Sequence, residues 1–187
     1  MINLLQEYLD PNRHYHNIEH ISNMLSNSNV FQLNLSDRIK LHTAIVYHDI
    51  VYDPTSNSNE EDSAKFFMTD LMNGEIKYNQ KVISHSELSG AVWVMIHSTK
   101  DHIPTSDMCK YIIDLDLWEL ADSEKYIKNR ALIRKEYSMY SDRDFLLGRN
   151  EWIESMLNKK QIYYTDYCIE NGFEENARKN LLVDLNE

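Results

Sequence analysis

Glycine and proline are scarce in this chain. The 187 residues include four glycines and three prolines, about 4% together, against roughly 12% in an average protein. Both residues interrupt helices, so their scarcity favours long helices joined by short connections. Apolar residues recur at helical spacing in several segments, and strand-like alternation is weak throughout. The sequence therefore predicts an all-α protein, built as a helical bundle.

Cysteines and long apolar runs are also few. The two cysteines, Cys109 and Cys168, suggest free thiols in a reducing compartment. No apolar run approaches the ~20 residues that span a bilayer. The first apolar residues are followed at once by Glu7, Asp10 and Pro11, which does not fit a signal peptide. We therefore expect a cytoplasmic protein.

Basic charge is low, with 19 Lys and Arg against 30 Asp and Glu and a net charge of −11. A nucleic-acid backbone or an anionic membrane would be repelled, so we expect neither as a partner. A small phosphorylated substrate remains compatible, because a bound divalent metal can reverse the local field. There is no internal repeat and no long linker, so residues 1–187 are interpreted as a single domain.

The apolar spacing and the capping residues give approximate helix positions. Ser36 is a plausible N-cap for a helix that contains the His48-Asp49 pair, and Pro54 predicts that this helix ends a few residues after the pair. Asn59 is a plausible N-cap for a second helix, which starts with acidic residues. Further helices are expected near residues 87–100, 109–120, 124–140, 143–158 and 174–185.

Eight histidines is about twice the usual share, and their placement points to a site. His16 and His20 are four residues apart, so a single helix would turn both towards the same side. His48 and Asp49 follow an apolar stripe, which directs His48 into the core. A carboxylate buried without a partner would cost several kcal/mol, and a metal ion offsets that cost.

Downstream, one aspartate and one histidine are the further ligand candidates. Asp116 has Ile112 four residues before it and Leu120 four after it, so it shares an apolar stripe, as a ligand in a bundle core should. Asp114 competes with it, and periodicity alone does not separate the two. His102 is in line with the inward stripe of the preceding helix, whereas His97 is not.

These residues, taken in order, resemble the H…HD…D signature of the HD-domain superfamily of metal-dependent phosphohydrolases. The resemblance is closest to a bacterial subgroup of predicted HD hydrolases. It spans nearly the whole chain and is carried by Arg13-His14-Tyr15-His16-Asn17 with His20-Ile21, Ala44 to Asp53, Asn59-Glu60 with Ser63-Ala64, Thr99-Lys100 with His102, Asp114 to Leu117, Gly148-Arg149 and Ala177 to Leu181.

The resemblance implies a helical HD-type fold with one divalent metal held by two histidines and two aspartates. The ligands would be His48, Asp49, Asp116 and a first histidine. His20 is the first choice for that histidine, and His16 is either a ligand or a residue that orients one. Imidazole and carboxylate ligands suit Mn²⁺, Fe²⁺, Co²⁺, Ni²⁺ or Zn²⁺.

The expected activity is hydrolysis of a phosphate ester or anhydride in a small molecule, with a mononucleotide as the leading candidate. Glu60 or His102 would transfer protons, and Lys100 and Arg149 would bind the substrate phosphate. Two alternatives remain open. One is an oxidative enzyme with two irons on the same fold, which needs further histidine ligands such as His102. The other is a metal-stabilised binding or regulatory module without turnover.

Overall fold

The computed structural model describes residues 4–186, and within that range it contains helices and no strand. The α-helices are α1 (Leu4–Glu7), α2 (Ile18–Asn27), α3 (Leu35–Tyr47), α4 (Asn59–Met72), α5 (His85–Asp101), α6 (Asp107–Asp116), α7 (Ser123–Glu136), α8 (Asp142–Leu157), α9 (Asp166–Glu170) and α10 (Phe173–Leu185). Two short 3₁₀ helices are η1 (Ser28–Val30) and η2 (Trp118–Ala121). The prediction of an all-α protein is confirmed for these residues.

Helix α5 is at the centre of the first half of the fold. It packs against α3, α4 and α6, and its residues Leu88, Val92 and Met95 are fully buried. These positions are three to four residues apart, so they form one apolar face of the helix. The buried core extends from Tyr8 to Leu181, so a single core joins the N-terminal and C-terminal helices.

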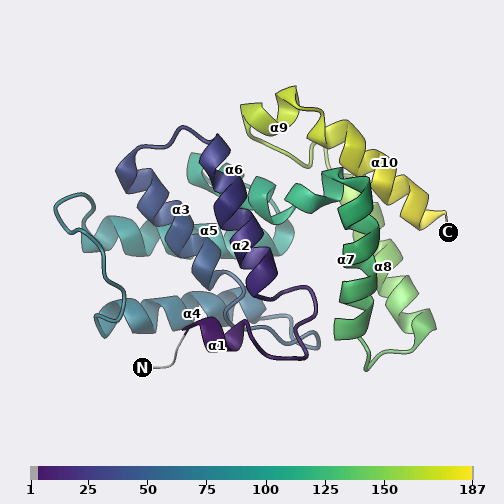
Figure 1. The fold of residues 1–187 in the computed structure, drawn as a ribbon, viewed down its shortest axis with the longest axis horizontal. Coiled ribbons are helices and arrows are strands. Elements are labelled where there is room, and N and C mark those ends of the chain that lie inside the picture. The colour runs from purple at the N-terminus through teal and green to yellow at the C-terminus, as the bar shows by residue number, and fades with distance from the viewer. Residues whose placement is uncertain (1–3, 187) are drawn as a thin grey trace.

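Helices α7, α8 and α10 form the second part of the fold, on the right in Figure 1. The 3₁₀ helix η2 connects α6 to α7 and packs against both α7 and α10. Helix α10 also contacts α8 and α9. This arrangement places α7 and α8 opposite the ends of the earlier helices, where the pocket described below lies.

Several predicted helix boundaries were wrong by a few residues. Asn34 rather than Ser36 caps α3, since its side chain accepts the amide hydrogen of Asp37. Ser58 rather than Asn59 precedes α4. Helix α3 ends at Tyr47, before the His48-Asp49 pair rather than after it. The segment predicted as one helix near 109–120 ends at Asp116 and continues as η2, and the one near 124–140 ends at Glu136.

No helix within residues 4–186 combines the length and the apolar character that crossing a membrane requires.

Candidate metal centre

His20 in α2, Asp116 in α6 and His48, which follows the end of α3, lie close together. One ligand atom from each lies within 4.8 Å of the other two. His20 Nε2 is 3.2 Å from Asp116 Oδ1, and His48 Nε2 is 3.7 Å from the same oxygen. Asp49 lies beside them, with Oδ2 3.0 Å from His48 Nε2 and 3.9 Å from His20 Nε2. Two imidazoles therefore face two carboxylates in a small volume.

The orientation of His48 directs its Nε2 at these carboxylates. Its Nδ1 is 2.8 Å from the carbonyl oxygen of Ile45, which can only accept, so Nδ1 carries the proton. The Nε2 atoms of His48 and His20 are buried and make no hydrogen bond within the described residues, despite the nearby oxygens. Buried nitrogen atoms without a partner are rare and costly. A cation placed between the imidazoles and the carboxylates would give both the nitrogens and the carboxylate oxygens a partner.

Three helices end at this cluster. His48 is the C-cap of α3, His102 is the C-cap of α5, and Asp116 is the last residue of α6. The C-terminus of a helix carries the negative end of its dipole and unpaired carbonyl groups, which favour a nearby cation. The backbone therefore contributes negative potential at the same place as the side chains.

The backbone of Asp49 is held from another part of the chain. The Arg13 guanidinium donates to the carbonyl oxygens of Asp49 at 2.6 Å and Ile50 at 2.9 Å. The Ser63 hydroxyl bonds both the amide and the carbonyl of Val51, at 3.1 and 3.2 Å. These contacts fix the turn after α3 and, with it, the position of the Asp49 side chain.

The competition between Asp114 and Asp116 is resolved by their partners. Asp114 is fully buried away from the cluster. It accepts hydrogen bonds from the amides of Tyr164 and Thr165 and from the Thr165 hydroxyl, at 2.6 to 3.1 Å. Asp114 therefore fastens the segment before α9, whereas Asp116 faces the histidines.

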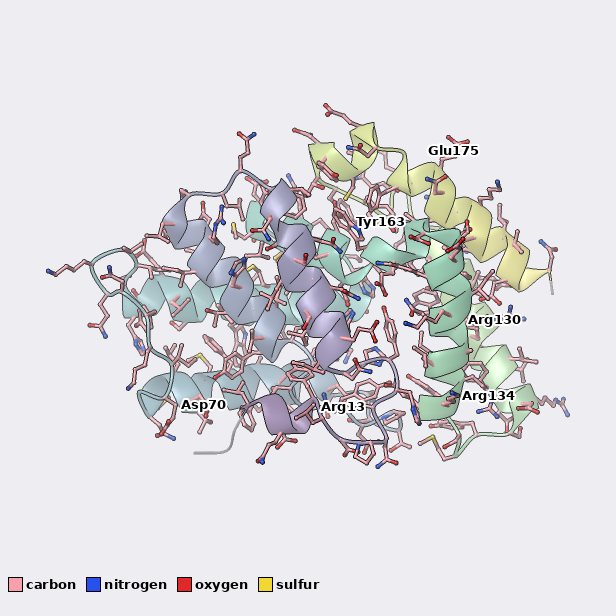
Figure 2. The ribbon with its side chains drawn as sticks, viewed as in Figure 1. Arg13, Asp70, Arg130, Arg134, Tyr163 and Glu175 are labelled. Atoms are coloured by element: carbon pink, nitrogen blue, oxygen red, sulfur yellow. The ribbon has the colours of Figure 1, made fainter. Side chains whose placement is uncertain are left out.

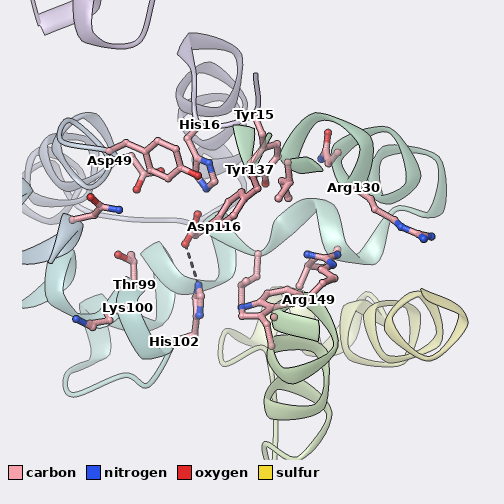
Figure 3. A pocket seen from close by; sticks show the side chains of 18 of the residues that line it. Tyr15, His16, Asp49, Thr99, Lys100, His102, Asp116, Arg130, Tyr137 and Arg149 are labelled. Carbon is pink, nitrogen blue, oxygen red and sulfur yellow. Dashed lines mark hydrogen bonds and ion pairs between the residues drawn. The ribbon is translucent and has the colours of Figure 1, made fainter. Parts of the chain in front are cut away.

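His102 is a contact of Asp116, and His97 is not. His102 adopts a left-handed conformation with φ of 50°, which turns its side chain back after the end of α5. Its Nε2 lies 3.2 Å from Asp116 Oδ2, as Figure 3 shows by a dashed line. His97 bonds the Trp93 carbonyl through Nδ1 and packs on the Trp93 ring. The sequence distinction between these two histidines therefore agrees with their contacts.

The close packing of these groups shifts their pKa values. Burial by itself lowers the pKa of His48, but the Asp49 and Asp116 carboxylates outweigh it and raise this pKa well above its ordinary value. Burial raises the pKa of Asp49, yet His48 outweighs that effect and lowers the pKa to about 2. Burial opposes ionisation of Asp116 too, but His102, His20 and His48 hold its pKa well below the usual range. The carboxylates are thus ionised, as metal ligands must be.

His16 lies beside the cluster but outside α2, which begins at Ile18 after the Asn17 cap. The expectation that one helix carries both His16 and His20 was therefore wrong. Asn17 is the N-cap of the helix, so His16 lies in the loop before it. His16 Nδ1 is 2.8 Å from Glu136 Oε2, and its ring stacks on Tyr52 with centroids 4.2 Å apart.

Glu136, at the end of α7, is the residue of this region that the sequence analysis missed. Its side chain is fully buried. One oxygen accepts the amides of Tyr15 and His16 at 2.7 and 2.9 Å, and the other accepts from the Tyr52 hydroxyl at 3.1 Å as well as contacting His16. Burial alone would raise the pKa of Glu136, but the hydrogen bond and charge of His16 lower it. The carboxylate thereby links the loop before α2 to the second part of the fold.

A pocket of about 490 Å³ opens from this cluster towards α7 and α8, within the range of small-molecule sites. Figure 3 shows Asp49, Asp116 and His102 at one wall and Arg149 at the other. All four residues predicted for proton transfer or phosphate binding line it, namely Glu60, His102, Lys100 and Arg149. Within residues 4–186, the Glu60 side chain makes no hydrogen bond and no ion pair.

The two predicted phosphate-binding residues differ in their surroundings. Lys100 is exposed and its ammonium bonds the carbonyl of Asn57. Arg149 is largely buried and pairs with Asp184. They lie on opposite sides of Asp116 and His102 (Figure 3).

The donor set fits a divalent transition metal. Imidazole nitrogens, which lose their proton when a metal binds, and ionised carboxylates are ligands that Mn²⁺, Fe²⁺, Co²⁺, Ni²⁺ and Zn²⁺ accept. His48 is already oriented by a backbone carbonyl, as metal-binding histidines usually are. His20, His48 and Asp116 can therefore hold a metal ion.

Comparison of the chain with models of protein families, with curated proteins and with solved structures gave no match. The cluster of histidines and aspartates and the adjoining pocket are therefore the basis for proposing a function.

Proposed function

We propose that this protein is a metal-dependent phosphohydrolase of the HD-domain type, acting on a small phosphorylated molecule, with a mononucleotide as the leading candidate. The observation that carries the proposal is the pair of buried imidazole nitrogens without partners, His20 Nε2 and His48 Nε2, directed at the carboxylates of Asp49 and Asp116. A cation is the group that satisfies all four, and the cluster opens into a pocket of substrate size.

The metal ligands in this proposal are His20, His48, Asp49 and Asp116. A divalent metal held there supplies Lewis acidity to a phosphoryl oxygen and acidifies bound water. His102 orients Asp116 through its Nε2 contact rather than serving as the main proton carrier. Lys100, on the metal side of the pocket, neutralises charge on the phosphoryl group.

Two groups are placed to move protons. Glu60 lines the pocket with a carboxylate that has no partner within the described part of the chain, so it is available to accept a proton from the attacking water. His16 also lines the pocket, and because Glu136 holds its Nδ1, its Nε2 is left for a substrate oxygen. His16 is therefore assigned to hydrogen bonding of the substrate rather than to metal ligation.

The test is a phosphate-release assay over nucleotides, sugar phosphates and other esters, with purified protein freed of metal and then supplied with single divalent ions. We expect release that chelation suppresses and a transition metal restores, and that is absent in a variant with Asp116→Asn. If the metal-loaded protein is inert towards the whole panel but consumes oxygen with an organic substrate, the oxidative alternative replaces this proposal. Inertness in both assays with the metal bound favours a binding module.

A further inference from the structure

Three aromatic side chains where α7 turns into α8 lie outside the hydrophobic core. Tyr137, Tyr140 and Phe145, called the aromatic cluster below, all line the pocket. Among the described residues, they belong neither to the buried core nor to the apolar side chains packed against it. Tyr137 and Phe145 are half-buried, and Tyr140 is exposed. Apolar surface left at a cavity is unfavourable in water, so the aromatic cluster favours an apolar partner inside the pocket.

The aromatic cluster is held in place by Arg134, near the C-terminal end of α7 (Figure 2). The Tyr137 ring centroid is 5.9 Å from that of Phe145 and 6.0 Å from that of Tyr140. Arg134 donates to the carbonyl oxygens of Tyr137 and Tyr140 at 2.9 and 3.2 Å. Its guanidinium pairs with Asp142 at 2.6 Å and lies 5.0 Å from the Phe145 ring centroid. Because these contacts fix the loop beforehand, a ligand that packs on the rings has less disorder to remove.

The aromatic cluster and the metal ligands share one pocket. Asp49 and Asp116 line it together with Tyr137, as Figure 3 shows. Tyr52 also lines it, with its ring stacked on His16 at 4.2 Å, so aromatic surface is present on the metal side as well. A cavity of about 490 Å³ exceeds what a phosphoryl group fills. A molecule with its phosphoryl group at the metal therefore has a further part that can reach the aromatic cluster.

The chemistry of this wall favours a planar ring as that further part. Leu117, Leu120 and Ile133 line the pocket too, and apolar side chains offer no hydrogen bond to the hydroxyls of a sugar. Aromatic pairs gain stability beyond the area that they bury. We infer that the aromatic cluster is the subsite for an aromatic group, so that the substrate is an aromatic phosphate ester or anhydride rather than the phosphate of a sugar or an alkyl chain alone. This inference rests on the proposed function in taking the metal as the holder of the phosphoryl group.

Binding of phosphonates tests the subsite without requiring hydrolysis. Calorimetry on the metal-loaded protein would compare phosphonates that carry a phenyl ring with those that carry a cyclohexyl ring, over alkyl spacers of one to four carbons. The two rings are similar in size and the cyclohexyl ring is the more apolar, so a preference for phenyl reports ring packing. At the best spacer the phenyl compound should bind about two- to tenfold more tightly. Equal binding at every spacer, or tighter binding of the cyclohexyl compounds, would overturn the inference.

A matched pair of tyrosines shows whether the preference arises at the aromatic cluster. Tyr140 and Tyr167 are 38% and 37% exposed. The Tyr140 ring contacts Tyr137 at 6.0 Å, and the Tyr167 ring contacts Trp118 at 5.7 Å. Of the two, Tyr140 lines the pocket and Tyr167 does not. Tyr140→Leu should lower the phenyl preference, and its combination with Phe145→Leu should abolish it. Tyr167→Leu should leave the preference unchanged.

A phenyl preference that persists in Tyr140→Leu contradicts the subsite, and so does one that is lost in Tyr167→Leu. Since Tyr140 is exposed and outside the core, its single substitution decides the question even if the double variant fails to fold. A preference that depends on Tyr140, in a protein that releases phosphate from no ester, would uphold the subsite and reject the hydrolase proposal. Phosphate release by a protein that binds both rings equally would reject the subsite alone.

Discussion

Asp114 and Asp116 are two positions apart in one helix, yet they have opposite surroundings. Positions two apart on an α-helix point to nearly opposite sides, so α6 directs Asp114 towards the backbone of residues 164 and 165 and Asp116 towards the histidines. In the sequence, both lie among the same apolar residues, so the hydrophobic pattern could not separate them. The partners that separate them, His20 and Thr165, are distant along the chain.

This contrast gives a matched pair of substitutions. Asp116→Asn should remove metal binding and leave the fold intact, because within residues 4–186 the ion-pair contacts of its carboxylate are with His20, His48 and His102. Asp114→Asn should retain the metal but lower the free energy of unfolding by about 1–3 kcal/mol, the cost of leaving a buried donor unsatisfied. Elemental analysis and urea unfolding of both variants would check this. Equal metal contents in the two would remove Asp116 from the site.

His102 and His97 form a second matched pair. Asparagine tolerates the left-handed backbone of residue 102 better than alanine, so the substitution tests the ring and not the backbone. His102→Asn should lower metal affinity about 10- to 100-fold, as loss of a residue that orients a ligand does, and His97→Asn should change it little. Metal titration by calorimetry measures both. Indistinguishable affinities would show that His102 has no influence on Asp116.

At the scale of elements, the end of α7 and the loop before α2 are joined by Glu136. Burial is the largest single effect on the pKa of His16, and it lowers this pKa. The hydrogen bond and charge of Glu136 and the charge of Asp49 together outweigh burial, so the pKa of His16 is raised from its ordinary 6.5. The pKa of Glu136 is lowered. The ion pair therefore contributes fully between the unfolded-state pKa of glutamate and that of histidine. That contribution is lost as the pH rises through the folded pKa of His16, and as it falls through that of Glu136.

Glu136→Gln should accordingly destabilise the metal-free protein in a pH-dependent way. The difference in unfolding free energy between the parent and this variant should be about 1–3 kcal/mol near pH 6 and should shrink towards pH 9, because His16 then loses its proton in the parent. Titration of His48 occurs in both proteins and cancels in the difference. Urea unfolding at a series of pH values measures it, and a difference that grows with pH would contradict the ion pair.

The sequence was sufficient for most elements and for singling out His20, His48 and Asp116, which the structure brings together, because these depend on local signals. The apolar spacing predicted α5 to within two residues of its start, and the polar run before Asn59 marked the beginning of α4. Local signals failed where tertiary contacts decide. Glu136 is the last residue of a largely polar helix, and nothing near it in the sequence singles it out. Its four hydrogen-bond contacts are with groups 84 to 121 positions away.

The position of His16 shows the same limit. A spacing of four from His20 is compatible with one helix, but the Asn17 side chain caps α2 by accepting the amide of Glu19, so His16 belongs to the loop. Arg149 is a further example. A Gly-Arg pair in an acidic protein suggested a phosphate contact, and only the structure shows that α10 supplies Asp184 to orient its guanidinium.

For the whole molecule, the cluster lies where several helices of the fold meet. Its proposed metal ligands come from α2, α6 and the residues that follow α3, so a bound metal would join three elements. Because unfolding separates these ligands, a metal at one hundred times its dissociation constant should stabilise the protein by about 2.7 kcal/mol. For a chain of this size the melting temperature should rise by roughly 5–10 °C. Thermal melts with and without metal measure the shift, and Asp116→Asn should show none.

The central claim is that one transition-metal ion, held by His20, His48, Asp49 and Asp116, makes this protein a phosphohydrolase. The most direct measurement is the rate of phosphate release from an active ester as the metal-free protein is titrated with Mn²⁺ or Co²⁺. The account predicts that the rate rises in proportion to bound metal, reaches its plateau at one ion per chain and returns to the background when a chelator is added. A rate that is independent of metal, or a chain that binds none, would contradict it.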